Sequence, residues 1–94
     1  MSELSLLTNH ARVLVCIALD REIRLRDIAV ALNLTERRVF GIVSELTAGG
    51  WVIKEKAGRR THYQIRLDVP LSEVVAREVT IGEVLELLVG STDT

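Results

Sequence analysis

The sequence is short of the residues that build disulfide frameworks, metal clusters and aromatic cores. Its 94 residues include a single cysteine, Cys16, which excludes an internal disulfide and a metal site with several cysteine ligands. Cys16 lies in the apolar run 13–19, where a free thiol packs as a small hydrophobic group; a redox sensor is the alternative. Only three residues are aromatic, so aliphatic side chains must build the core.

Long apolar runs are absent too. No stretch approaches the roughly 20 apolar residues that a membrane helix needs, and no basic segment precedes an apolar run as in a signal peptide. We therefore expect a cytoplasmic protein with no membrane partner. The length suits a single domain, residues 1–94.

The net charge of −1 hides an uneven distribution. Residues 1–66 carry eleven Lys/Arg and seven Asp/Glu, a balance of +4, whereas residues 67–94 carry one Arg and six acids, a balance of −5. This division predicts two surfaces with different roles. Accidental clustering on solvated faces is the alternative.

The first predicted helix begins at Thr8 or Asn9, both good N-caps, and runs through Leu19. From Val13 to Leu19 it is apolar all round, which is typical of a helix buried on most sides. A domain this small cannot cover all of that surface itself, so the pattern predicts a second subunit.

Two further helices are predicted at about Asp27–Leu32 and Glu36–Ala48. Asn33 ends the first because asparagine tolerates the left-handed conformation, and Thr35 is the N-cap of the second. The short alternating segment 22–25 favours a brief strand.

Two strands with a turn between them follow, at 51–56 and 61–67. The loop 57–60 joins them as a hairpin, in which Gly58 is free to adopt a positive φ. Pro70 then breaks the sheet, and residues 71–79 form either a short helix or a loose turn.

The last predicted helix spans Ile81–Val89. Thr80 and Glu83 have the spacing of a capping box at its start. Its apolar positions are too many for one stripe facing the core, so a partner subunit is again predicted to cover the remainder.

Helices 27–32 and 36–48 are close enough along the chain to form a helix-turn-helix. Ala29 provides the small side chain needed where the two helices cross, and Leu34 fills the turn. One face of the second helix is apolar and suits the core: Val39, Ile42, Val43 and Leu46.

The opposite face of helix 36–48 is small and polar, with arginines at its start, as in a helix that enters the DNA major groove. Arg37 can bond to guanine, Gly41 allows close approach, and Phe40 either touches a thymine methyl or packs at the domain edge. A solvated helix start is the alternative for the arginines, although the helix dipole disfavours cations there. The candidate DNA-binding residues of this helix are Thr35, Arg37, Arg38, Phe40, Gly41 and Ser44.

The hairpin supplies a second basic element. Its exposed tip can reach phosphates or the minor groove beside a helix-filled major groove; a charged turn that only aids solubility is the alternative. The candidate residues here are Lys54, Lys56, Arg59, Arg60 and His62.

Catalysis is not expected. The only histidines and cysteine are His10, Cys16 and His62, and none has a neighbouring partner set for general-base or nucleophilic chemistry. The sequence has neither a phosphate-binding glycine loop nor zinc-ligand spacing, so we expect no cofactor and no metal.

Residues 8–67 resemble the winged helix-turn-helix of bacterial and archaeal MarR-type and ArsR-type transcriptional regulators. The matching stretches are 27–29, 33–35, 39–46, 50–52 and 58–63. The resemblance implies a homodimer that reads a pseudo-palindromic operator, with Arg37, Gly41 and Ser44 in the groove and Arg59 and Arg60 on the wing. The chain is shorter than a typical MarR protein, so the usual long dimer helices are reduced. It also lacks the cysteine and paired-histidine metal sites of ArsR sensors, so the sequence does not support ligand sensing.

The expected fold is mainly α with a small β-hairpin (α+β): a three-helix core, a wing and a C-terminal helix. Residues 8–67 are the predicted DNA-binding core, and residues 68–94 are a helical extension for homodimerisation through the first and last helices. The predicted function is sequence-specific binding of double-stranded DNA by a transcriptional regulator. The alternatives are a winged helix that binds another protein, and a DNA binder of low specificity.

Overall fold

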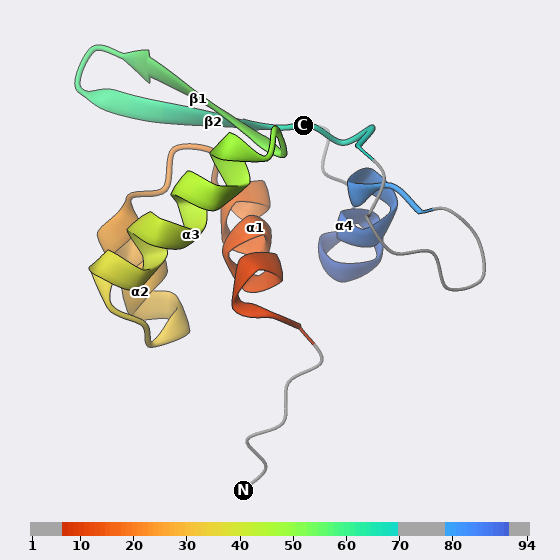
Figure 1. Ribbon diagram of the computed structural model, residues 1–94, viewed down its shortest axis with the longest axis horizontal. Coiled ribbons are helices and arrows are strands. Elements are labelled where there is room, and N and C mark those ends of the chain that lie inside the picture. Colours follow the sequence, from red (N-terminus) through yellow and green to blue (C-terminus); the bar gives the residue numbers. More distant parts are fainter. Residues whose placement is uncertain (1–6, 70–78, 91–94) are drawn as a thin grey trace, which may run out of the picture.

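Four helices and one hairpin make up the fold in the computed structural model of Figure 1, which describes residues 7–69 and 79–90. The elements in chain order are α1 (Asn9–Leu19), α2 (Leu25–Leu32), α3 (Glu36–Ala48), β1 (Val52–Ala57), β2 (Arg60–Ile65) and α4 (Ile81–Val89). The predicted class, mainly α with a β-hairpin, is confirmed. The prediction for residues 71–79 falls, apart from Val79, outside the described residues.

Three helices begin where threonine predicts them to begin. In each case the hydroxyl of the N-cap threonine accepts a hydrogen bond from a backbone N–H three residues further on, which satisfies one of the unpaired donors of the first turn. At α4, Glu83 closes the predicted capping box by accepting from the backbone N–H of Thr80. The caps are Thr8, Thr35 and Thr80, so Thr8 rather than Asn9 is the N-cap of α1.

The predicted strand at residues 22–25 is wrong. Leu25 already belongs to α2, which starts two residues earlier than predicted. One backbone hydrogen bond joins the preceding segment to the hairpin, from the N–H of Tyr63 to the carbonyl of Arg21 (2.8 Å). The start of α2 lacks a capping residue such as threonine. Its N-cap residue is Arg24, whose side chain makes no capping hydrogen bond.

The hairpin has a tighter turn than predicted. β1 and β2 pair from Val52–Ile65 to Ala57–Arg60, which leaves only residues 58 and 59 in the turn. Gly58 has a φ of 65°, as expected for the first position of a type II′ turn. β2 ends at residue 65 rather than 67, and the carbonyl of Leu67 beyond it accepts the N–H of Gly82 in α4.

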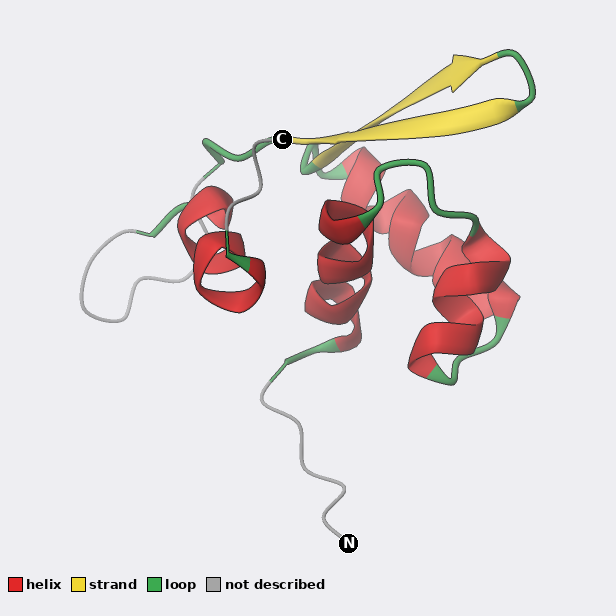
Figure 2. Cartoon of the chain, turned by 180° about the vertical axis from the view of Figure 1, so that it is seen from behind, coloured by secondary structure: helices red, strands yellow, loops and turns green. Residues whose placement is uncertain are grey.

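The buried side chains of all six elements form one cluster. Ala29 is 4% exposed, as the predicted close crossing of α2 and α3 requires, and Leu34 packs against the cluster. Figures 1 and 2 show α1 between the α2–α3 pair and α4, and α4 enters the cluster through Ile81 and Leu85. The C-terminal helix therefore shares the core of the helix-turn-helix.

Candidate nucleic-acid interface

Helix α3 presents the two faces that its sequence predicts. Its four apolar core positions are buried, with exposures of 0–5%. On the opposite side, Gly41 is half-buried, and a Cβ built there would meet no atom within 4 Å. The other candidates of this helix are all exposed: Thr35, Arg37, Arg38, Phe40 and Ser44. A narrow polar surface is thus open to a ligand along the outer side of α3.

The strand register decides where the hairpin lysines lie. Lys54 pairs with Tyr63 and Lys56 pairs with Thr61, so both lysines occupy the same face as buried Val52. This face covers the core near the hairpin base and becomes cationic toward the tip. Both lysines line a pocket together with Leu25 at the start of α2, and they do not lie on the outer face of the wing.

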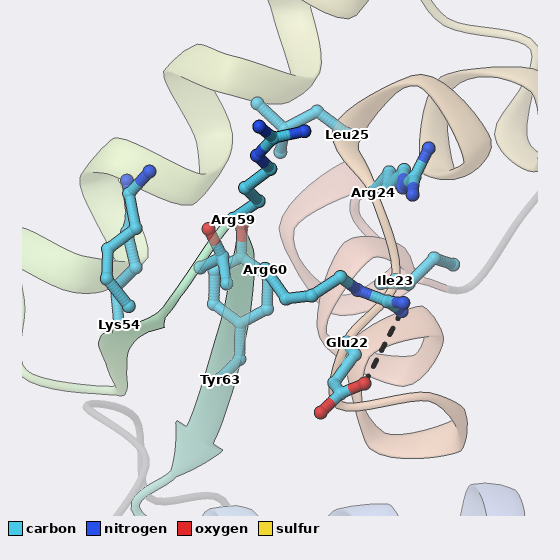
Figure 3. A pocket seen from close by; sticks show the side chains of 10 residues that line it. Glu22, Ile23, Arg24, Leu25, Lys54, Arg59, Arg60 and Tyr63 are labelled. Carbon is cyan, nitrogen blue, oxygen red and sulfur yellow. Dashed lines mark ion pairs between the residues drawn. The ribbon is translucent and has the colours of Figure 1, made fainter.

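The predicted wing cations converge on one open pocket of about 350 Å³ between the hairpin and the segment before α2 (Figure 3). Sequence reasoning missed two charged residues of this pocket, Glu22 and Arg24, because they fell in a segment interpreted as a strand. The hydrogen bond between Arg21 and Tyr63 holds this segment beside β2. The charged residues that line the pocket are Glu22, Arg24, Lys54, Lys56, Arg59 and Arg60.

Glu22 is the carboxylate of this basic pocket. One of its oxygens lies 3.4 Å from Nη2 of Arg60, and the other lies 3.7 Å from Nδ1 of His62. The side chains of Arg60 and Glu22 are 53% and 49% exposed, and such a solvated pair contributes at most about 1 kcal/mol. Glu22 thus contacts two of the predicted wing residues and forms a weak ion pair with Arg60.

The hairpin tip and the start of α3 lie toward the same end of the long axis of the molecule, and α4 lies toward the other end (Figures 1 and 2). The two groups of candidate residues come from separate stretches of the chain. The fold places the start of α3 and the hairpin tip, from which these residues come, on the half of the molecule that contains α2.

The residues considered for catalysis lie in ordinary structural environments. His10 contacts Glu45 at the surface, and burial raises the pKa of the Cys16 thiol, an effect that nearby Arg12 partly opposes. Burial likewise raises the pKa of Tyr63. Within residues 7–69 and 79–90, no three His, Cys, Asp or Glu side chains are grouped to hold a metal ion.

None of the helices in the described part of the chain has the length and apolar character needed to cross a membrane.

No family model matches the sequence, and no curated protein matches it. The structure is similar to the crystal structure of the zinc-dependent MarR family transcriptional regulator AdcR in the Zn(II)-bound state, with 22% identity and a TM-score of 0.50. The match covers 69% of this chain and 46% of that chain, so this chain spans less than half of its neighbour's length. The fold is therefore the winged helix found in a MarR family regulator. The resemblance to ArsR-type regulators stays a prediction.

Proposed function

We propose that this chain is a transcriptional regulator that binds double-stranded DNA in a sequence-specific manner. The observation that carries the proposal is that the start of α3, with its exposed arginines, and the tip of the cationic hairpin lie on the same half of a winged-helix fold. The major groove of DNA admits an α-helix, and a basic hairpin beside that helix reaches the adjoining phosphates or the minor groove.

The two elements have different tasks in this proposal. Arg37 bonds to a guanine edge, Gly41 lets the helix backbone approach the bases, and Ser44 contacts the groove floor. The hairpin, residues 54–61, binds phosphates or the minor groove, which fixes the register of the protein but carries little sequence information. The exposure of Arg37, Ser44 and residues 54–60 supports this proposal, whereas Gly41 and Thr61 are half-buried.

We further propose that the chain is one domain, in which residues 8–67 bind DNA and residues 68–94 dimerise it together with α1. The support is apolar surface at the end of α1 and along α4: Leu19 is 70% exposed, Leu87 88% and Leu88 42%. A two-fold dimer would place the two copies of α3 about 34 Å apart, one turn of DNA. Such a regulator would act in the cytoplasm, on the nucleoid.

Selection of bound sequences from random duplex DNA at fixed salt tests the function directly. The proposal predicts a palindromic consensus. If the unaltered chain binds no duplex but captures a protein partner through the same surface, the winged helix is a protein-binding module and the proposal is wrong.

Two variants separate the roles of the hairpin and the helix. Arg59→Ala/Arg60→Ala should weaken binding to every duplex and reduce the log–log salt slope by about 0.9 for each phosphate that the hairpin no longer neutralises. Arg37→Ala should cost about 1–3 kcal/mol and relax the preference at one base pair. Arg66→Ala is the matched control, because Arg66 is an exposed cation that follows the same hairpin arm, does not line the pocket and lies 3.8 Å from Asp68.

A further inference from the structure

The pocket between the hairpin and α2 concentrates more positive charge than the hairpin alone provides. Among the described residues that line it are five cations and one carboxylate, Glu22. Figure 3 shows the side chain of Arg24, from the segment before α2, across from Arg59 and Arg60 of the hairpin. Cations from two parts of the chain therefore surround one open space.

We propose that this pocket binds one backbone phosphate of the duplex, and that the phosphate displaces the carboxylate of Glu22 from Arg60. The proposal rests on the proposed function, because the duplex is the source of the phosphate. It assigns to Arg24 a direct contact with DNA and to Glu22 the role of an internal competitor.

The chemistry of the pocket fits a phosphate. Guanidinium groups present several N–H donors in a plane and bind carboxylate and phosphate oxygens in similar geometry. Arg60 already lies beside an oxyanion, the carboxylate of Glu22. Lys54 and Lys56 add point charges on the core-facing side of the hairpin, and the hydroxyl of Thr61 adds a donor.

The ion pair is weak enough to exchange. Its 3.4 Å separation exceeds the 2.7–2.9 Å of a strong charge-assisted hydrogen bond, and both side chains are about half exposed. A phosphate group offers more acceptor oxygens than Glu22 and can contact several of the surrounding cations at once. The carboxylate would then keep the cations positioned in the free protein and lower the affinity for every duplex.

The test measures affinity by fluorescence anisotropy over a salt series, for one duplex from the selection and one of unrelated sequence. Arg24→Gln should lower the affinity for both about fivefold near 0.15 M salt and reduce the log–log slope by about 0.9, as expected when one phosphate is no longer neutralised. Glu22→Gln should raise both affinities severalfold, because the competitor for Arg60 is removed.

A matched control isolates the pocket from the overall charge. Glu55→Gln makes the same change of charge on the same hairpin, but Glu55 does not line the pocket. It should change the affinity much less than Glu22→Gln does. Equal gains from the two variants would overturn the role of Glu22, and thermal unfolding of each variant checks that the fold is intact.

The remaining outcomes distinguish this proposal from the proposed function. If Arg24→Gln binds as the unaltered chain does while Arg59→Ala/Arg60→Ala loses affinity, the hairpin contacts DNA and the pocket assignment is wrong. If the unaltered chain binds no duplex, both proposals fail.

Inorganic phosphate, titrated into the free protein and followed by amide chemical shifts, should bind only weakly, at the segment before α2 and the hairpin. Tight binding of inorganic phosphate that leaves the affinity for DNA unchanged would overturn the assignment in favour of a small-anion site.

Discussion

The hairpin and α4 pack on the same core but present opposite exteriors. The hairpin buries Val52 and Tyr63 and carries lysines and arginines toward its tip, whereas α4 buries Ile81 and Leu85 and carries leucines and glutamates outside. The sequence shows the same division, with +4 in residues 1–66 and −5 in residues 67–94. One small core thus supports a surface that attracts a polyanion and another that repels it.

In both elements the buried residues stabilise the fold, whereas the exposed residues are available for binding. The inner residues of both elements are nearly inaccessible, so substitutions there should act on stability wherever they lie. Substitutions of the outer residues should act on binding, and the kind of binding should differ between the hairpin and α4.

The largest effect is expected from Leu85→Ala. Leu85 is 1% exposed, and its removal should destabilise the fold by about 2–5 kcal/mol, because apolar burial decreases and a cavity is left behind. Chemical unfolding measures this change. A cost below about 1 kcal/mol would show that α4 packs only loosely against the rest of the fold. The hairpin and α4 would then not share one core, and the comparison between them would fail.

Leu87→Ala is the matched control on the same helix. Leu87 is 88% exposed, so its truncation should change the stability of the monomer by less than about 0.5 kcal/mol. In sedimentation at tens of micromolar, however, the proposed dimer should weaken. A chain that is monomeric before and after the change would contradict assembly through α4.

Alanine substitutions at two helical glycines give the next effect, and they should change the stability of the fold in opposite directions. A Cβ on Gly82 would lie 2.9 Å from the carbonyl oxygen of Leu67, which is backbone and cannot move aside cheaply. Gly82→Ala should therefore cost about 1–3 kcal/mol. Gly41→Ala meets nothing within 4 Å and should stabilise α3 by about 0.5–1 kcal/mol.

Gly41→Ala should change DNA affinity and stability in opposite directions. A methyl group on the outer side of α3 would hold the helix backbone away from the bases, so Gly41→Ala should bind DNA more weakly although it unfolds at a higher temperature. If Gly41→Ala gains stability and retains full affinity for DNA, the outer face of α3 does not approach the duplex.

The last comparison concerns the threonine caps. Thr35→Ala and Thr80→Ala should each cost about 1 kcal/mol, because each removes an acceptor from the first turn of a helix. Only Thr35→Ala should also weaken DNA binding, since Thr35 precedes the arginines of α3. Equal effects of the two variants on DNA affinity would remove the functional distinction between the helices.

Local signals made much of the fold predictable. Three threonine caps marked the starts of α1, α3 and α4, and Gly58 marked the turn of the hairpin. The start of α2 was missed because Arg24 offers no such cap, and four alternating residues were too few to distinguish a strand from an irregular segment.

The candidate site was predictable only in part. Exposed cations on α3 and the hairpin follow from helix and strand periodicity, whereas the pocket depends on contacts between residues distant in sequence. Glu22 and Arg24 reach it because the carbonyl of Arg21 accepts the N–H of Tyr63 in β2. Nothing in the local pattern of residues 21–25 predicts that hydrogen bond, so neither residue was found.

The central claim is that one half of the molecule faces DNA and the other does not. Amide chemical shifts, recorded while a duplex from the selection is titrated into the labelled protein, test it residue by residue. We expect large shifts in residues 35–44 and 54–60, and shifts in residues 81–89 no larger than those that dimerisation alone produces. Shifts centred on α4, with α3 and the hairpin unchanged, would contradict the account.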